Sequence, residues 1–325
     1  MPEERSQTLL ERAGETAAGL GSVGQGNPRL RRGIEIGLGL LIAAFLAVFV
    51  ATQWNRLPDY DWEFRPEWLV AGTVAVAFFY ALQCEAWLWI IRALGEEIDS
   101  RAGRSIWGRS LIARYVPTNA LMVVGRVVMA ERRGVSKRVC LASIVYEAGL
   151  AISTAVMAGA YFVITLPGLE DQPVRYGVVA VVPLALVVLH PRVFHPLADF
   201  ALTKLGRAPL PATLPFGRVL QFVLVYATAW LAIGFGLVAF AASLHPLNTE
   251  DVAYAAAAYP VAFCVAVLTF VVPGGLGTRD AALAVSLAAV LPGAVATAIA
   301  VGFRIFQTAI ELLFVAFVTL VGRGR

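Results

Sequence analysis

The sequence has few charged residues and few cysteines, and it lacks the motifs of soluble enzymes. Only 15% of its 325 residues are charged, against about 25% in soluble domains. The three cysteines (Cys84, Cys140 and Cys264) lie in separate apolar segments without metal-ligand spacing, which predicts buried thiols rather than a disulfide framework or a zinc site. No nucleophile elbow, Walker motif or acidic metal cluster is present. We therefore expect neither an enzyme nor a resident cofactor or metal.

Apolar residues are what the sequence has in excess. Hydrophobic side chains make up 59% of the chain, and the mean hydropathy is +0.74. Several runs approach or exceed the roughly 20 apolar residues that a helix needs to cross a bilayer. The predicted fold is therefore an all-α polytopic membrane protein. Membrane segments are expected at residues 34–52, 68–94, 105–129, 139–166, 176–190, 219–244, 252–272, 281–291 and 294–321.

Two of these segments are unsuited to crossing the bilayer as single helices. Residues 105–129 contain Pro117 and are basic at both flanks. Residues 281–291 follow Pro273 and would form only about 17 Å of helix. We predict about six full spans and two broken or re-entrant elements, with these prolines at the breaks. Such breaks are tolerated at membrane depth where they are buried in protein or line a wet cavity.

The two breaks occupy related places in residues 68–166 and 219–321, which is the pattern of an inverted repeat around a central cavity. The two predicted halves are joined by a linker, residues 191–218, that carries an amphipathic patch. Together they would form one transmembrane domain, residues 33–321. Residues 1–32 are polar and predict a mobile tail, and residues 322–325 form the other terminus.

Basic residues are distributed unevenly between the two predicted sides of the membrane. Twenty-one of the 26 lysines and arginines fall in residues 1–33, 91–138, 191–218 and 322–325. The opposite loops, 53–67, 166–175 and 245–252, hold three basic and eight acidic residues. The positive-inside rule then predicts that both termini and the amphipathic linker are cytoplasmic. The net charge of +4 comes from the predicted cytoplasmic segments. It therefore gives no reason to expect a nucleic-acid partner.

Ionisable side chains within the membrane segments are the candidate site residues, because each costs about 2.5–3.5 kcal/mol to insert. Arg304, Gln307 and Glu311 have the spacing i, i+3, i+7, which places them on one helix face. A candidate headgroup site combines this stripe with charged residues elsewhere and with a glycine-rich turn. The further members are Arg126, Glu147, Gly274, Gly275, Gly277, Arg279 and Asp280.

The glycine-rich turn before Arg279 favours binding of an anion. Gly274, Gly275 and Gly277 permit close approach of the backbone, and a helix that begins at Arg279–Asp280 offers free N–H groups to a phosphate. A second interpretation is open for the charged set, in which Arg126 and Arg304 neutralise carboxylates and simply hold helices together. Arg109, Arg114 and Glu85 are also interpretable as interfacial or snorkelling groups.

Two runs of residues resemble a known family. The first includes Arg114-Tyr115-Val116-Pro117, Gly125-Arg126, Gly134-Val135-Ser136 and Tyr146-Glu147, and the second is Pro273-Gly274-Gly275-Leu276-Gly277-Thr278-Arg279-Asp280 with Arg304 and Glu311. They resemble the flippase-like transmembrane domain of lysylphosphatidylglycerol synthases. The resemblance covers roughly residues 33–321. Four positions depart from the family pattern: Thr118 in place of Gly, Ala148 in place of Arg, Ala151 in place of Asp, and Asp280 in place of Glu.

The resemblance implies a lipid-translocating domain in a bacterial or archaeal cytoplasmic membrane. We see no counterpart of the family's aminoacyl-transferase domain, so it implies flipping rather than lipid synthesis. The expected cargo is an anionic or aminoacylated phospholipid or a polyprenyl-phosphate sugar for envelope assembly. The alternative is a non-transporting scaffold or regulatory subunit of an envelope glycosyltransferase or lipid synthase. An envelope-synthesis enzyme as partner and a homo-oligomer are both compatible with the sequence.

Overall fold

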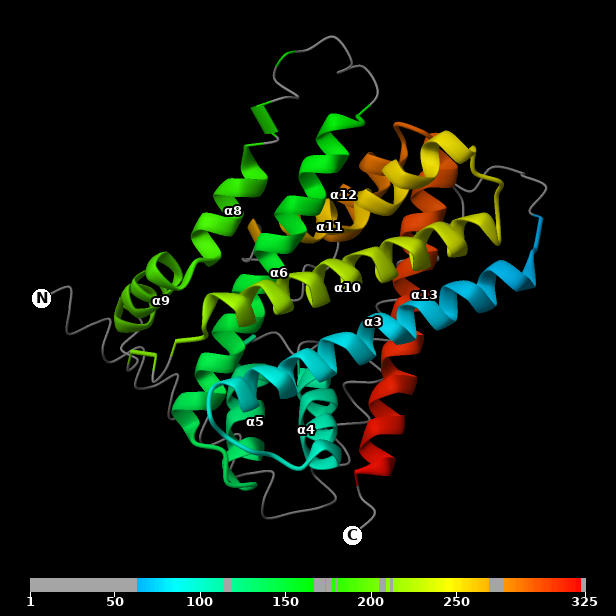
Figure 1. Ribbon diagram of the computed structural model, residues 1–325. Helices are drawn as coiled ribbons and strands as arrows, with labels where there is room; N and C mark the ends of the chain where they lie inside the picture. Colours follow the sequence, from blue (N-terminus) through cyan, green and yellow to red (C-terminus); the bar gives the residue numbers. More distant parts are fainter. Residues whose placement is uncertain are drawn as a thin grey trace, which may run out of the picture. The chain divides into compact units, whose positions relative to one another are not determined.

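The computed structural model describes residues 63–113, 119–166, 173, 177–178, 180–204, 209–210, 213–268 and 278–322 (Figure 1). This part of the chain is helical. Its helices are α3 (Pro66–Ala93), α4 (Ser100–Ile112), α5 (Asn119–Glu131), α6 (Lys137–Ile164), α8 (Val181–Leu189), α9 (Pro191–Lys204), α10 (Phe216–Ala242), the 3-10 helix η2 (Thr249–Asp251), α11 (Val252–Leu268), α12 (Thr278–Leu287) and α13 (Gly293–Val321).

Within these residues the structure confirms an all-α polytopic membrane protein. Five helices are long and apolar enough to cross a membrane, or six if the bent pair α8–α9 forms one span. The long spans are α3, α6, α10, α11 with η2, and α13. The predicted first span, residues 34–52, lies outside the described residues.

The predicted span at residues 176–190 differs from the others. Its described helix, α8, has nine residues, or about 14 Å, which is too short to cross alone. It reaches the length and hydropathy of a span only together with the start of α9, from which it is bent by 71°. His190 separates the two helices, because its backbone is extended.

The first predicted break separates two helices that pack against each other, α4 and α5. Each has 13 residues. Asp99 begins α4 by accepting a hydrogen bond from the backbone N–H of Ala102 at 2.9 Å, which is a typical N-cap. Pro117 itself lies outside the described residues. At the second break, α12 begins at Thr278 and therefore places Arg279 and Asp280 in its first turn.

Helices α3 and α10 run side by side in opposite directions across the middle of Figure 1. The start of α3 meets the end of α10, where the N–H of Arg65 donates to the carbonyl of Ser243 at 3.0 Å. Two glycines permit the close approach: a Cβ on Gly72 would lie 3.3 Å from the carbonyl oxygen of Gly236. Small residues at a crossing are what allows membrane helices to pack closely.

The packing between the two predicted halves, α3–α6 and α10–α13, occurs in equivalent pairs. Helix α4 packs on α13 as α11 packs on α6, and α3 contacts α13 as α10 contacts α6. Hydrogen bonds between the halves also occur in equivalent pairs. Tyr80 of α3 donates to Glu311 of α13, and Trp230 of α10 donates to Thr154 of α6. Tyr80 and Trp230 each stand fourteen residues after the first residue of their helix. The two predicted halves therefore share a pattern of contacts, while the inverted repeat stays a prediction.

Candidate functional site

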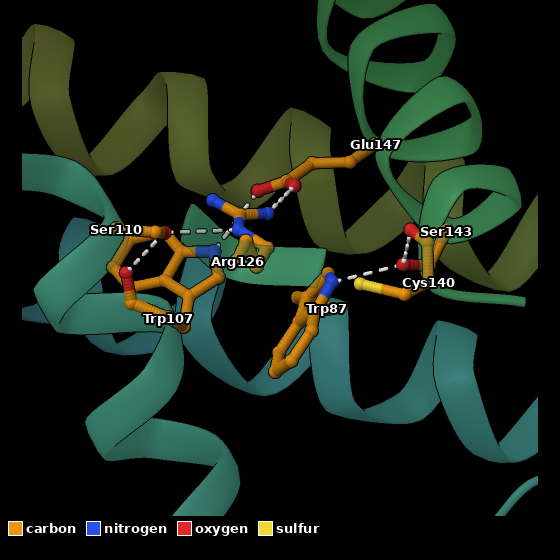
Figure 2. Close-up of polar contacts among 7 residues, drawn as sticks. All are labelled: Trp87, Trp107, Ser110, Arg126, Cys140, Ser143 and Glu147. Carbon is orange, nitrogen blue, oxygen red and sulfur yellow. Dashed lines mark hydrogen bonds and ion pairs between the residues drawn. The ribbon is translucent and has the colours of Figure 1, made fainter. Parts of the chain in front are cut away.

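The first polar cluster surrounds Arg126 of α5 (Figure 2). Its guanidinium forms an ion pair with Glu147 of α6 and donates through Nε to the Ser110 hydroxyl of α4 at 2.9 Å. Trp107 of α4 donates its indole N–H to the other oxygen of Glu147 at 3.0 Å. The Arg126 side chain is only 2% exposed. Three helices therefore hold one neutral pair away from solvent.

Aromatic rings complete the surroundings of Arg126. Its guanidinium carbon lies 5.4 Å from the ring centre of Trp87 and 5.9 Å from that of Trp107, within the range of cation–π attraction. Trp87 also donates to the Ser143 hydroxyl of α6 at 3.0 Å, as Figure 2 shows. The pairing that was open in the sequence is thus decided for Arg126, which neutralises Glu147.

A buried hydroxyl lies within reach of the same charges. Tyr226 of α10 is fully buried, and its hydroxyl has no hydrogen-bond partner among the described residues. An unpaired buried hydroxyl is unfavourable by roughly 1–3 kcal/mol, so Tyr226 is a polar group that a bound molecule or water would stabilise.

The second cluster is the polar stripe of α13. Gln307 and Glu311 are buried, whereas Arg304 is half-buried. Gln307 is the central residue of the 29-residue helix, with fourteen residues on either side (293–306 and 308–321). The stripe faces protein rather than lipid, as the sequence predicts, and it lies at the middle of a span.

A directed chain of hydrogen bonds crosses four helices in this cluster. Arg279 of α12 donates to the Tyr259 hydroxyl of α11 at 3.0 Å, and Tyr259 donates to the Gln307 carbonyl at 2.8 Å. The Gln307 amide donates to the Tyr80 hydroxyl of α3 at 3.0 Å, and Tyr80 donates to Glu311 at 2.7 Å. Each group donates toward the carboxylate, so the chain is polarised from a cation to an anion.

Arg279 also has a neighbour of opposite charge on its own helix. Its Nε lies 3.8 Å from the Asp280 carboxylate, a longer contact than the hydrogen bonds around it. The guanidinium stands over the Tyr259 ring at 5.3 Å and reaches the Gln307 carbonyl at 3.3 Å. Both side chains of the pair are largely buried. Arg279, Asp280, Gln307 and Glu311 therefore come together, as the sequence predicts.

The two clusters repeat one arrangement with different partners. In the first, an aromatic donor of α4 (Trp107) and the arginine of α5 (Arg126) meet on a carboxylate of α6. In the second, an aromatic donor of α11 (Tyr259) and the arginine of α12 (Arg279) meet on an amide of α13. The acceptor that the two donors share is thus a carboxylate in the first cluster and a neutral amide in the second, where Arg279 lies 3.8 Å from the Asp280 carboxylate.

Phe314 of α13 links the two clusters. Its ring stacks with Tyr80 at 6.0 Å between ring centres and meets Trp107 edge-on at 6.2 Å. Tyr80 belongs to the chain that ends at Glu311, and Trp107 binds Glu147. The two charged clusters are consequently separated by a single aromatic side chain.

Several site residues were not found by sequence reasoning. Tyr80, Trp107, Ser110 and Tyr259 form hydrogen bonds with the charged side chains, the first two as donors and the last two as acceptors, yet each reads in the sequence as part of an apolar run. Glu85 was interpreted as snorkelling, whereas it pairs with Arg104 of α4. The predicted site residues Gly274, Gly275 and Gly277, together with Pro273, lie outside the described residues.

The described part of the chain therefore defines a multi-pass helical membrane protein with two buried polar clusters between its spans. The chain belongs to the family of the lysylphosphatidylglycerol synthase TM region, whose model matches residues 36–314. This confirms the resemblance carried by the motifs and associates the chain with membrane lipids of the cell envelope. Searches of the curated proteins and of the solved structures gave no match.

Proposed function

We propose that this protein moves a lipid with an anionic headgroup between the leaflets of the cytoplasmic membrane. The cargo is an anionic or aminoacylated phospholipid or a polyprenyl-phosphate sugar. The phosphate would bind at Arg279, while the acyl or prenyl tails remain in the bilayer. This proposal extends the lipid-related role of the family to a transport activity and to particular residues.

The observation that carries the proposal is the chain from Arg279 to Glu311. Its middle member, Gln307, is the central residue of α13, and Tyr80 and Tyr259 lie near the middle of α3 and α11. Ionisable groups at such depth are costly and are typical of substrate pathways. A site at the interface of the repeats near the midplane is also typical of transporters.

The two ends of the chain suit the two charges of the proposed cargo. Arg279 offers a planar guanidinium, which binds phosphate through two parallel hydrogen bonds. Glu311, at the other end, would balance that cation or bind the amino group of an aminoacylated lipid. Asp280 and Arg304 border the same network, and we expect them to adjust its charge as the headgroup enters.

Leaflet exchange in proteoliposomes tests the proposal. The purified protein would be reconstituted with labelled phosphatidylglycerol, its lysyl form or a polyprenyl-phosphate sugar. Wild type would be compared with Arg279→Ala. Arg104→Ala is the matched control, because Arg104 forms its ion pair with Glu85 away from the network and its side chain is 41% exposed. Gel filtration would establish that all proteins are folded.

We expect protein-dependent exchange of one lipid, lost in Arg279→Ala and retained in Arg104→Ala. Exchange that survives Arg279→Ala would support transport but remove the headgroup site from Arg279. Folded wild-type protein that exchanges none of the three lipids would overturn the proposal. The scaffold alternative would then be pursued by co-purification of an envelope-synthesis enzyme.

A further inference from the structure

We propose that α9 lies along a membrane surface, with its outward apolar face in the boundary between lipid headgroups and acyl chains. The proposal concerns an interaction surface outside the two polar clusters, and it does not depend on transport. It rests on the faces of α9, on its packing against α6 and on the helix that precedes it.

Helix α9 has three distinct faces. Phe194 and Ala198 are buried. Val193 and Leu197, one turn apart, are 40% and 54% exposed, although both are apolar. The third face is polar, with His195 paired to Asp199 at 3.1 Å. A helix with an apolar stripe that its own protein leaves uncovered, beside a polar face, is typical of interfacial helices.

The buried face fixes the rotation of α9 on α6. The Phe194 ring stacks with Tyr146 of α6, with 4.9 Å between ring centres. Phe194 also fills the space over Gly149, where an added Cβ would lie 2.5 Å from a ring carbon. Asp199 accepts the backbone N–H of Leu210 at 2.7 Å. These contacts leave Val193 and Leu197 facing away from the helix bundle.

The occupant of the outward face is a lipid leaflet because the neighbouring surface is already apolar. Helix α8 exposes Leu184 and Val187, and its nine residues contain no polar side chain. Helix α9 leaves α8 at an angle of 71°, so a helix that follows a membrane segment turns toward the membrane plane. The exposed basic residue Arg192 at its start suits anionic headgroups.

Fluorescence quenching in nanodiscs of phosphatidylcholine and phosphatidylglycerol tests this assignment. The environment-sensitive dye NBD would be attached to Leu197→Cys on the apolar face or, as the matched control, to Thr203→Cys, whose side chain is also exposed. Cys264→Ala serves as background, because Cys84 and Cys140 are buried. Labelling of the background alone measures any reaction of those two thiols.

Lipids brominated on the upper acyl chain should quench the dye at position 197 at least about twofold more strongly than at position 203, and aqueous iodide should show the opposite preference. Three results would overturn the proposal. Iodide quenching at both positions without bromine quenching places α9 in water. Equal bromine quenching at both positions submerges the whole helix. Protection of position 197 from both quenchers shows that protein covers this face.

Discussion

Arg126 and Arg279 show how one residue type is used in two ways within one membrane protein. Both guanidinium groups stand over aromatic rings and share an acceptor with an aromatic donor from a preceding helix. Arg126 meets the carboxylate of Glu147, and Arg279 meets the amide of Gln307. The two arginines therefore differ in the acceptor that they share with an aromatic donor, and the contact of Arg279 with a carboxylate, Asp280, is the longer one at 3.8 Å.

Removal of the carboxylate partner of Arg126 should be strongly destabilising. Glu147→Ala leaves a cation that is 98% buried without compensation, and we expect a loss of about 3–5 kcal/mol in the free energy of unfolding. Thermal unfolding in detergent would measure it. Arg126→Leu combined with Glu147→Leu should recover most of the loss, since no lone charge remains. Glu85→Ala, at the half-exposed pair with Arg104, should change stability by less than about 1 kcal/mol.

Replacing Gln307, whose side-chain amide accepts a hydrogen bond from Arg279, tests whether a neutral acceptor is needed there. Gln307→Glu places a carboxylate at the shared acceptor of the second cluster, as Glu147 does in the first, and a charged hydrogen bond stabilises by about 1.5–3 kcal/mol. If the proposed transport holds, the new carboxylate should compete with the phosphate and lower leaflet exchange by about tenfold or more. The protein should stay folded. Unchanged exchange would argue against phosphate binding at Arg279.

At the scale of the elements, glycines determine where spans approach each other. Gly72 and Gly236 lie at the crossing of α3 and α10, and Gly234 lies where α10 meets α11. A Cβ on Gly234 would stand 2.6 Å from the carbonyl oxygen of Ala256. Because that atom belongs to the backbone of a helix, it cannot move without shifting α11, which carries Tyr259.

Gly234→Ala should accordingly destabilise the fold by about 1–3 kcal/mol through overpacking, with a lower midpoint of thermal unfolding. Gly217→Ala is the matched control in the same helix, because nothing lies within 4 Å of its added Cβ. Alanine favours helices over glycine, so the control should be neutral or slightly more stable. Equal effects of both substitutions would mean that α10 and α11 do not approach closely at Gly234.

At the scale of the whole molecule, the equivalent contacts of α3–α6 and α10–α13 bring the second helix of one half against the last helix of the other. This exchange explains why the second polar cluster draws on helices far apart in sequence. Tyr80 and Glu311 are 231 residues apart and share a 2.7 Å hydrogen bond. The second cluster consequently depends on both halves being assembled, whereas the hydrogen bonds and the ion pair of the first cluster lie within α3–α6.

The basic residues of the loops predict the orientation of the molecule, and fusion proteins test this prediction. Green fluorescent protein joined after Arg325 should fluoresce, because the positive-inside rule places this terminus in the cytoplasm. Alkaline phosphatase inserted after His245, in the loop that ends with Glu250 and Asp251, should be active outside. Phosphatase activity at Arg325 with a silent insertion at His245 would reverse the topology.

The sequence by itself determined the elements, because their signals are local. Apolar runs of about 20 residues specify spans wherever they occur, and Pro117 and Pro273 predict breaks in segments that would otherwise read as continuous. The stripe of Arg304, Gln307 and Glu311 followed from helical spacing alone, and the burial of Gln307 and Glu311 in the structure agrees. The family resemblance rested on the same local motifs and was confirmed over residues 36–314.

Only the tertiary structure decided which residues meet. In the sequence Arg126 has several carboxylates as candidate partners, and contact with Glu147 depends on how α5 packs against α6. Tyr80, Trp107 and Tyr259 look like core aromatics, because a hydroxyl or indole N–H gives no periodic signal. Their roles as donors arise when α3, α4 and α11 place them beside charged side chains that the bilayer cannot solvate.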